Sequence, residues 1–192
     1  MRAKDCSRRR RAILLCRKRF PGDNEFMTQT DEKVPQPAPL AVFVDADACP
    51  ARDEILMICK RHAVVPTYVA NSEILAITNS MDAKMKVVPG DFDGADNWLI
   101  EQANEGDLIL TADLLLAQRA VKKKIEVMNF SGSVWTDDVI HDLVARREVQ
   151  KFLREMSLPS HHPVSYSKEN RSRLKSALHQ WLESRLRARR SS

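Results

Sequence analysis

Five aspartates stand where carboxylates could act together on one ligand. They are Asp45, Asp47, Asp93, Asp96 and Asp113. Clustered carboxylates repel one another unless a cation compensates their charge, and oxygen-rich sites suit Mg²⁺ or Mn²⁺. Ions held in this way activate a water molecule and stabilise the leaving oxygen of a phosphodiester. The residue types therefore predict a divalent-metal site for hydrolysis.

The first pair of acids follows a buried strand, and the pattern recurs later in the chain. The apolar residues 40–44 stop at Asp45 and Asp47, and the apolar residues 108–110 run through Thr111 to Asp113. Open α/β sheets bind ligands outside the carboxyl ends of their strands, so acids at these points are site candidates if the two strands are neighbours. Alternatively, Asp47 caps the next helix and Asp45 makes a turn.

Asp93 and Asp96 are spaced to share one side of the first turn of a helix, where the helix dipole tolerates negative charge. Two polar residues are auxiliary candidates. Thr111 could hold a metal-bound water or a phosphate, or it could be a β-former at a strand end. Asn97 lies beside Asp96 and has a similarly open assignment. Cys49 has no histidine nearby in the sequence, so we expect a small buried residue rather than a thiol nucleophile.

The elements needed to position these residues alternate between short apolar runs and helical patterns. This alternation predicts an α/β fold with a mostly parallel central sheet of about five strands and helices on both faces. Residues 129–135 are predicted to be a loop. A helix is expected to start after Thr136 and to continue towards Met156 with a break, and a last helix is expected from Lys168 to about Arg189.

The N-terminal residues 1–39 show no coherent pattern and are predicted to be a flexible basic and proline-rich extension before a single domain of residues 40–190. Met27 would be an ordinary start, so we interpret residues 1–26 as an upstream extension. The alternative is a basic arm that binds nucleic acid.

The charge is unevenly distributed along the chain. Residues 1–26 hold nine Lys or Arg and three acids, a net of +6, and residues 168–190 hold eight and two, again +6. With a total of +5, residues 27–167 carry −7. An acidic body with a basic C-terminal helix predicts cation binding beside a surface for phosphates, with RNA as the expected partner, although the helix could simply have a solvated face.

The four cysteines have no metal-ligand spacing, so a reducing cytoplasmic location is expected. No apolar run approaches the roughly 20 residues of a membrane span.

Four ordered motifs make the chain similar to the YaiI/YqxD family of small bacterial proteins. They are VDADACP at 44–50, FDGADNWLIEQ at 92–102, GDLILTADLLLA at 106–117 and SGSVWTDDVI at 131–140. The resemblance runs from about Leu40 to Arg187. It implies a relation to PIN-like domains, and hence a three-layer α/β fold with an acid cluster resembling the metal site of PIN ribonucleases. Asp45, Asp93, Asp96 and Asp113 match that cluster, with Asp47 as an auxiliary acid.

Three functions are compatible with these residues. The first is a divalent-metal nuclease that hydrolyses RNA. The second is a non-catalytic module that binds RNA or protein and retains the acids. The third is a phosphatase of the haloacid dehalogenase type, because DADAC resembles DxDx[TV]; Asp45 would then be the nucleophile and Asp47 the general acid.

Overall fold

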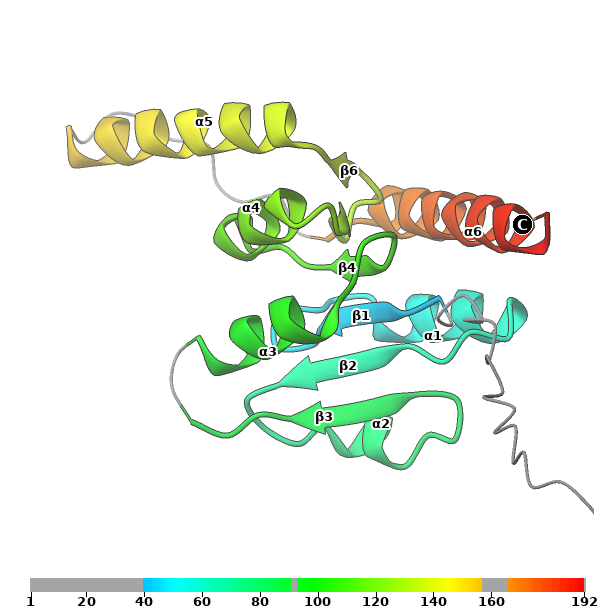
Figure 1. The fold of residues 1–192 in the computed structure, drawn as a ribbon. Coiled ribbons are helices and arrows are strands. Elements are labelled where there is room, and N and C mark those ends of the chain that lie inside the picture. Colours follow the sequence, from blue (N-terminus) through cyan, green and yellow to red (C-terminus); the bar gives the residue numbers. More distant parts are fainter. Residues whose placement is uncertain (1–39, 91–92, 157–165, 192) are drawn as a thin grey trace, which may run out of the picture. The chain divides into compact units, whose positions relative to one another are not determined.

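A six-stranded sheet forms the centre of the fold in the computed structural model (Figure 1). The structure describes residues 40–90, 93–156 and 166–191, which all belong to one compact unit, Pro37–Ser192. The predicted N-terminal extension, residues 1–39, lies outside the described residues. The strands are β1 (Val42–Asp45), β2 (Thr67–Ala70), β3 (Lys84–Val87), β4 (Leu108–Leu110), β5 (Glu126–Met128) and β6 (Val134–Trp135).

The strand order β3-β2-β1-β4-β5-β6 places β1 and β4 side by side at the centre. The first five strands are parallel, as their apolar runs predicted. β6 pairs antiparallel with β5, so the prediction that residues 129–135 are only a loop was wrong for the last two. That strand has two residues and is held by pairing with a neighbour, which leaves no periodic signal in the sequence.

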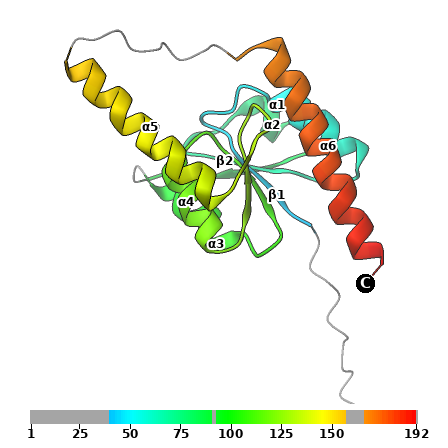
Figure 2. The ribbon, with the colours of Figure 1, turned by 90° about the horizontal axis from the view of Figure 1, so that it is seen from above.

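Helices cover the two faces of the sheet (Figure 2), six of them within the described residues. They are α1 (Arg52–Arg61), α2 (Leu75–Thr78), α3 (Gly94–Gln102), α4 (Leu114–Lys122), α5 (Asp137–Glu155) and α6 (Lys168–Arg190). Successive residues of β1 point to opposite faces of the sheet and pack in two separate hydrophobic cores. Val42 and Val44 pack with α1 and α6, whereas Phe43 packs with α3 and α4. The structure is therefore the predicted three-layer α/β arrangement, because the central strands β1 and β4 bury apolar residues on both sides.

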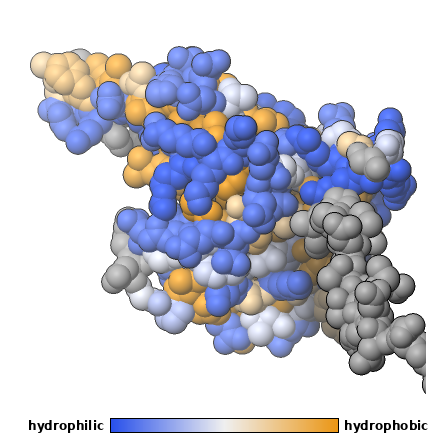
Figure 3. Space-filling view, in the orientation of Figure 1, coloured by the Kyte–Doolittle hydropathy of each residue, from blue (hydrophilic) through white to orange (hydrophobic). Residues whose placement is uncertain are grey.

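Helix α5 is continuous from Asp137 to Glu155, so the predicted break was wrong. Its first half packs through Ile140 on the core formed with α3 and α4. Its second half exposes Val149 and Phe152, and Figure 3 shows hydrophobic surface gathered towards this end of the helix. Only the first half therefore contributes to the described core.

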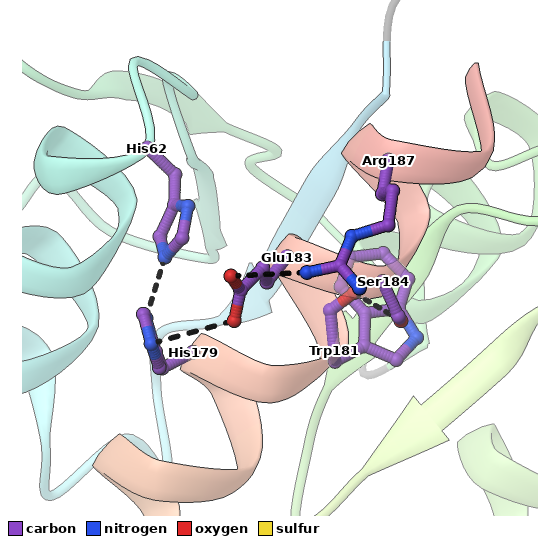
Figure 4. Close-up of polar contacts among 6 residues, drawn as sticks. All are labelled: His62, His179, Trp181, Glu183, Ser184 and Arg187. Carbon is purple, nitrogen blue, oxygen red and sulfur yellow. Dashed lines mark hydrogen bonds and ion pairs between the residues drawn. The ribbon is translucent and has the colours of Figure 1, made fainter. Parts of the chain in front are cut away.

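Helix α6 is fastened to the body by apolar and polar contacts. Leu178 and Leu182 are fully buried, and the Trp181 indole N–H donates to Glu126 Oε2 on β5 at 2.8 Å. On the α1 side, His62 Nε2 lies 2.7 Å from His179 Nδ1, as Figure 4 shows. These contacts fix α6 between the end of α1 and the outer part of the sheet.

None of the described helices carries an apolar stretch long enough to cross a bilayer.

Candidate carboxylate site

Asp45 and Thr111 meet at the carboxyl edge of the two central strands. The register that pairs Val44 with Leu110 puts the next residues of β1 and β4 opposite each other. Thr111 is fully buried, and its hydroxyl donates to Asp45 Oδ2 at 2.8 Å. The hydroxyl oxygen of Thr111 in turn accepts the backbone N–H of Asp113 at 2.9 Å. Thr111 therefore orients Asp45 and Asp113 from below the site.

Asp113 is the N-cap of α4 as well as a site residue. Its Oδ1 accepts the backbone N–H of Leu115 at 2.6 Å and that of Leu116 at 3.4 Å. Capping α4 is compatible with a place in the candidate site, because an N-cap carboxylate lies at the surface of a strand-to-helix turn. One of its oxygens is committed to α4.

Asp47 does not cap the following helix. Helix α1 begins only at Arg52 and has no side-chain cap, whereas Asp47 Oδ2 accepts the backbone N–H of Asn71 at 3.0 Å. Asp45 is the last residue of β1, and its carboxyl also interacts with the backbone N–H of Asp47, two residues on, as an aspartate at a turn does. The capping alternative for Asp47 is thus wrong: Asp47 ties the loop after β1 to the loop after β2.

Helix α3 brings the remaining predicted acids. Asp93 is at its N-cap position without a side-chain cap hydrogen bond, and Asp96 is in its first turn. Asn97 points to α4, where its Oδ1 accepts from Arg119 Nη2 at 2.6 Å. Asn97 therefore positions an arginine at the site.

All five predicted aspartates line one cleft of about 650 Å³. Arg119 of α4 and Arg147 of α5 also line it. Neither arginine was predicted. The only sequence signal for Arg119 was its place on the helix that follows Asp113, and Arg147 lies on a distant helix. We name this space the acidic cleft; Thr111 lies beneath it.

The acids in the cleft influence one another electrostatically. The pKa of Asp96 is raised to about 6, mainly by burial and in addition by the negative charges of Asp113, Asp45 and Asp93, while Arg119 opposes the rise. Burial also raises the pKa of Asp45; the Thr111 hydroxyl opposes this, and Asp47 and Asp113 add to it. Carboxylates from β1, α3 and α4 are therefore close enough to disfavour one another's charge.

The chemistry of the donors fits a hard divalent cation, because every candidate ligand is a carboxylate oxygen and the two arginines of the cleft offset only part of the charge of its five aspartates. Their spacing is wider than a coordination sphere: within residues 40–90, 93–156 and 166–191, no three His, Cys, Asp or Glu side chains are grouped to hold an ion. A bound cation would have to draw the carboxylates together.

Burial raises the pKa of Cys49 to about 12, so its thiol is not ionised at neutral pH.

The fold and the cleft define a class: α/β proteins with a mostly parallel sheet and a carboxylate site where β1 and β4 diverge into their helices. The chain belongs to the YaiI/YqxD family, whose profile, described as "Uncharacterized BCR, YaiI/YqxD family", matches residues 43–184.

The chain is similar to curated UPF0178 proteins. That of Rhodospirillum rubrum is 34% identical over 144 residues, which cover 75% of this chain and 96% of the relative. That of Rhizobium etli is 37% identical over 132 residues, which cover 69% and 84%. No solved structure matches the chain significantly.

Proposed function

We propose that the protein is a divalent-metal-dependent nuclease of PIN-like type that hydrolyses RNA phosphodiester bonds at the acidic cleft. The observation that carries this proposal is the convergence of carboxylates from β1, α3 and the start of α4 in one cleft, where burial and the neighbouring negative charges raise the pKa of Asp45 and Asp96. A divalent cation would relieve this repulsion.

Asp45, Asp93, Asp96 and Asp113 would hold Mg²⁺ or Mn²⁺. When bound, the cation supplies activation of water and stabilisation of the leaving oxygen. Asp47 would position the loop after β1, because its carboxylate is bonded to the backbone of Asn71.

Two arginines on the rim would bind the phosphate. Arg119 is oriented by its bond to Asn97 at 2.6 Å, and Arg147 enters from α5. A guanidinium suits this purpose because it binds phosphate oxygens through paired N–H groups.

The basic helix α6 would add sequence-independent attraction to RNA. Part of its charge is already used within the protein: Arg171 pairs with Glu54, Arg185 with Glu126 and Arg187 with Glu183. Its contribution would therefore be smaller than its composition indicates. We also assign the protein to the cytoplasm, where Cys49 and Cys59, both free and buried, would stay reduced.

The test uses purified full-length protein, Mn²⁺ and labelled single-stranded RNA, with Asp45→Asn and Asp113→Asn as variants. Asparagine is as good an N-cap as aspartate, so Asp113→Asn removes the charge and keeps the start of α4. Glu101→Gln, on the exposed end of α3, is the matched control. We expect cleavage in the wild type and the control and a loss of at least about 100-fold in both aspartate variants.

A second readout does not depend on activity. Mn²⁺ should raise the melting temperature of the wild type, and this gain should fall in both variants. Hydrolysis of a phosphomonoester with an aspartyl-phosphate trapped on Asp45 would replace the nuclease with a phosphatase. Stabilisation by metal with no turnover of either substrate would favour the binding module.

A further inference from the structure

A second cleft opens beside the acidic cleft and has the opposite charge. Its volume is about 540 Å³, and it shares Ala48, Ala112 and Arg147 with the acidic cleft. Its walls come from the loops after β1 and β5, from α5 and from the start of α6. We name this space the arginine cleft.

The lining of the arginine cleft combines cationic and flat apolar groups. Arg146 and Arg147 line it, and among the described residues no acidic side chain does. Both arginines are exposed, and in the part of the chain that the structure describes neither pairs with a carboxylate. The apolar wall includes Trp135 and Tyr166; Tyr166 is partly exposed. A fitting ligand is anionic and carries a flat ring.

Amide groups give this cleft polar partners as well. Asn129 and Asn170 line it, on the loop after β5 and on α6. Their Oδ1 atoms already accept hydrogen bonds from Ser131 and Ser133 and from Arg173, so their NH₂ groups are the donors offered to the acceptors on a nucleobase edge. A nucleotide combines the three matching groups: a phosphate for the guanidinium groups, a ring for the apolar wall and a polar edge for the amides.

The wall is held in place before any ligand binds. Asn129 Oδ1 accepts from the backbone N–H groups of Ser131 and Ser133, both at 2.9 Å. Gly132 packs so closely on α6 that an added Cβ would lie 2.7 Å from the backbone carbon of Arg173. The loop after β5 is thus seated directly on α6, so binding would not have to order it.

We propose that the arginine cleft binds one unpaired nucleotide of a single-stranded nucleic acid, next to the phosphodiester held in the acidic cleft. This inference rests on the proposed nuclease function, which places the phosphodiester to be cleaved in the acidic cleft and the neighbouring nucleotide in the arginine cleft. Arg147 lines both clefts and contacts the phosphate between them, while Arg146 contacts the nucleotide further along. A paired base is stacked inside a duplex and cannot reach the wall, so the cleft selects single strands.

Binding is measured by fluorescence anisotropy with a labelled single-stranded RNA of about eight nucleotides, in EDTA, so that cleavage plays no part. Arg146→Ala should weaken binding about tenfold, because it removes a charge-assisted contact to phosphate. Lys151→Ala removes one positive charge from the next turn of α5 without touching the cleft, and it should weaken binding less than about twofold. Equal effects of the two variants would overturn the proposal.

Three competitors distinguish the source of the affinity. The unlabelled single strand should compete best, and a free mononucleotide should compete weakly. A duplex of the same sequence and a polyphosphate without bases should both compete poorly. Competition by polyphosphate as strong as that of RNA would show that the ring wall is not used and would overturn the proposal. If Arg146→Ala weakens binding but no RNA is cleaved with Mn²⁺, the nuclease proposal fails and the nucleotide site in the arginine cleft stands. If RNA is cleaved but Arg146→Ala does not weaken binding, the nuclease proposal stands and the nucleotide site fails.

Discussion

Removing the charge of Asp96 should stabilise the metal-free protein at neutral pH. Its pKa rises from the ordinary 3.8 to about 6, so the folded chain holds this proton more tightly than the unfolded chain. The ionised carboxylate therefore costs stability above pH 6, and the cost disappears as the pH falls towards 3.8. Burial, with repulsion from the neighbouring carboxylates, thus outweighs the favourable helix dipole at the first turn of α3.

The magnitude follows from the shift. Two pKa units correspond to about 3 kcal/mol as an upper bound. Asp96 is partly exposed, and solvent screening reduces this figure to about 1 kcal/mol. For a domain of this size, Asp96→Asn should raise the melting temperature by about 3 °C at pH 7.5.

The assay is thermal unfolding of wild type, Asp96→Asn and the Glu101→Gln control in EDTA at pH 7.5 and pH 4. The gain of Asp96→Asn should be present at pH 7.5, shrink at pH 4 and be absent from the control. Mg²⁺ or Mn²⁺ should stabilise the wild type more than Asp96→Asn. A variant no more stable than the wild type at pH 7.5 would refute the cost of the ionised Asp96 carboxylate that burial and neighbouring charge impose.

Three further predictions concern single contacts. Gly132→Ala should lower the free energy of unfolding in urea by at least about 2 kcal/mol, because the added Cβ would meet the backbone of α6. Gly106→Ala is the control: Gly106 also has a positive φ but faces open space, so this substitution should cost only about 1 kcal/mol. Thr111→Val should cost about 1–3 kcal/mol in the same assay, since the buried hydroxyl bonds to Asp45. His62→Gln should flatten the loss of stability expected between pH 7 and pH 5.5.

The sign of the histidine prediction follows from its surroundings. Burial at the end of α1 lowers the pKa of His62 below the ordinary 6.5, His179 and Arg61 lower it further, and Glu183 opposes them. The unfolded chain therefore takes up the proton first as the pH falls through 6.5, and stability is lost. Unfolding midpoints of wild type and His62→Gln that change with pH in parallel would contradict this account, as would equal costs for the two glycine variants or no cost for Thr111→Val.

Much of the carboxylate site could be predicted because its geometry follows from strand order. Apolar runs that end in Asp45 and in Thr111 with Asp113 identify two buried strands, and neighbouring parallel strands end at one edge. Asp96 could be placed in the first turn of α3 by its spacing from Asp93. The roles of Asp47 and Asn97 could not be predicted, since their partners are the Asn71 backbone and Arg119, which only packing brings near.

By itself, then, the sequence determined the three-layer α/β class, the five parallel strands and which acids stand at strand and helix ends, because these depend on local apolar periodicity. Only the tertiary structure decided what surrounds those acids. It gave Asp96 its raised pKa, seated Gly132 on α6 and brought Arg146 and Arg147 beside the acidic cleft. The physical reason is that burial, charge repulsion and close packing act between side chains distant along the chain, and no local pattern encodes those distances.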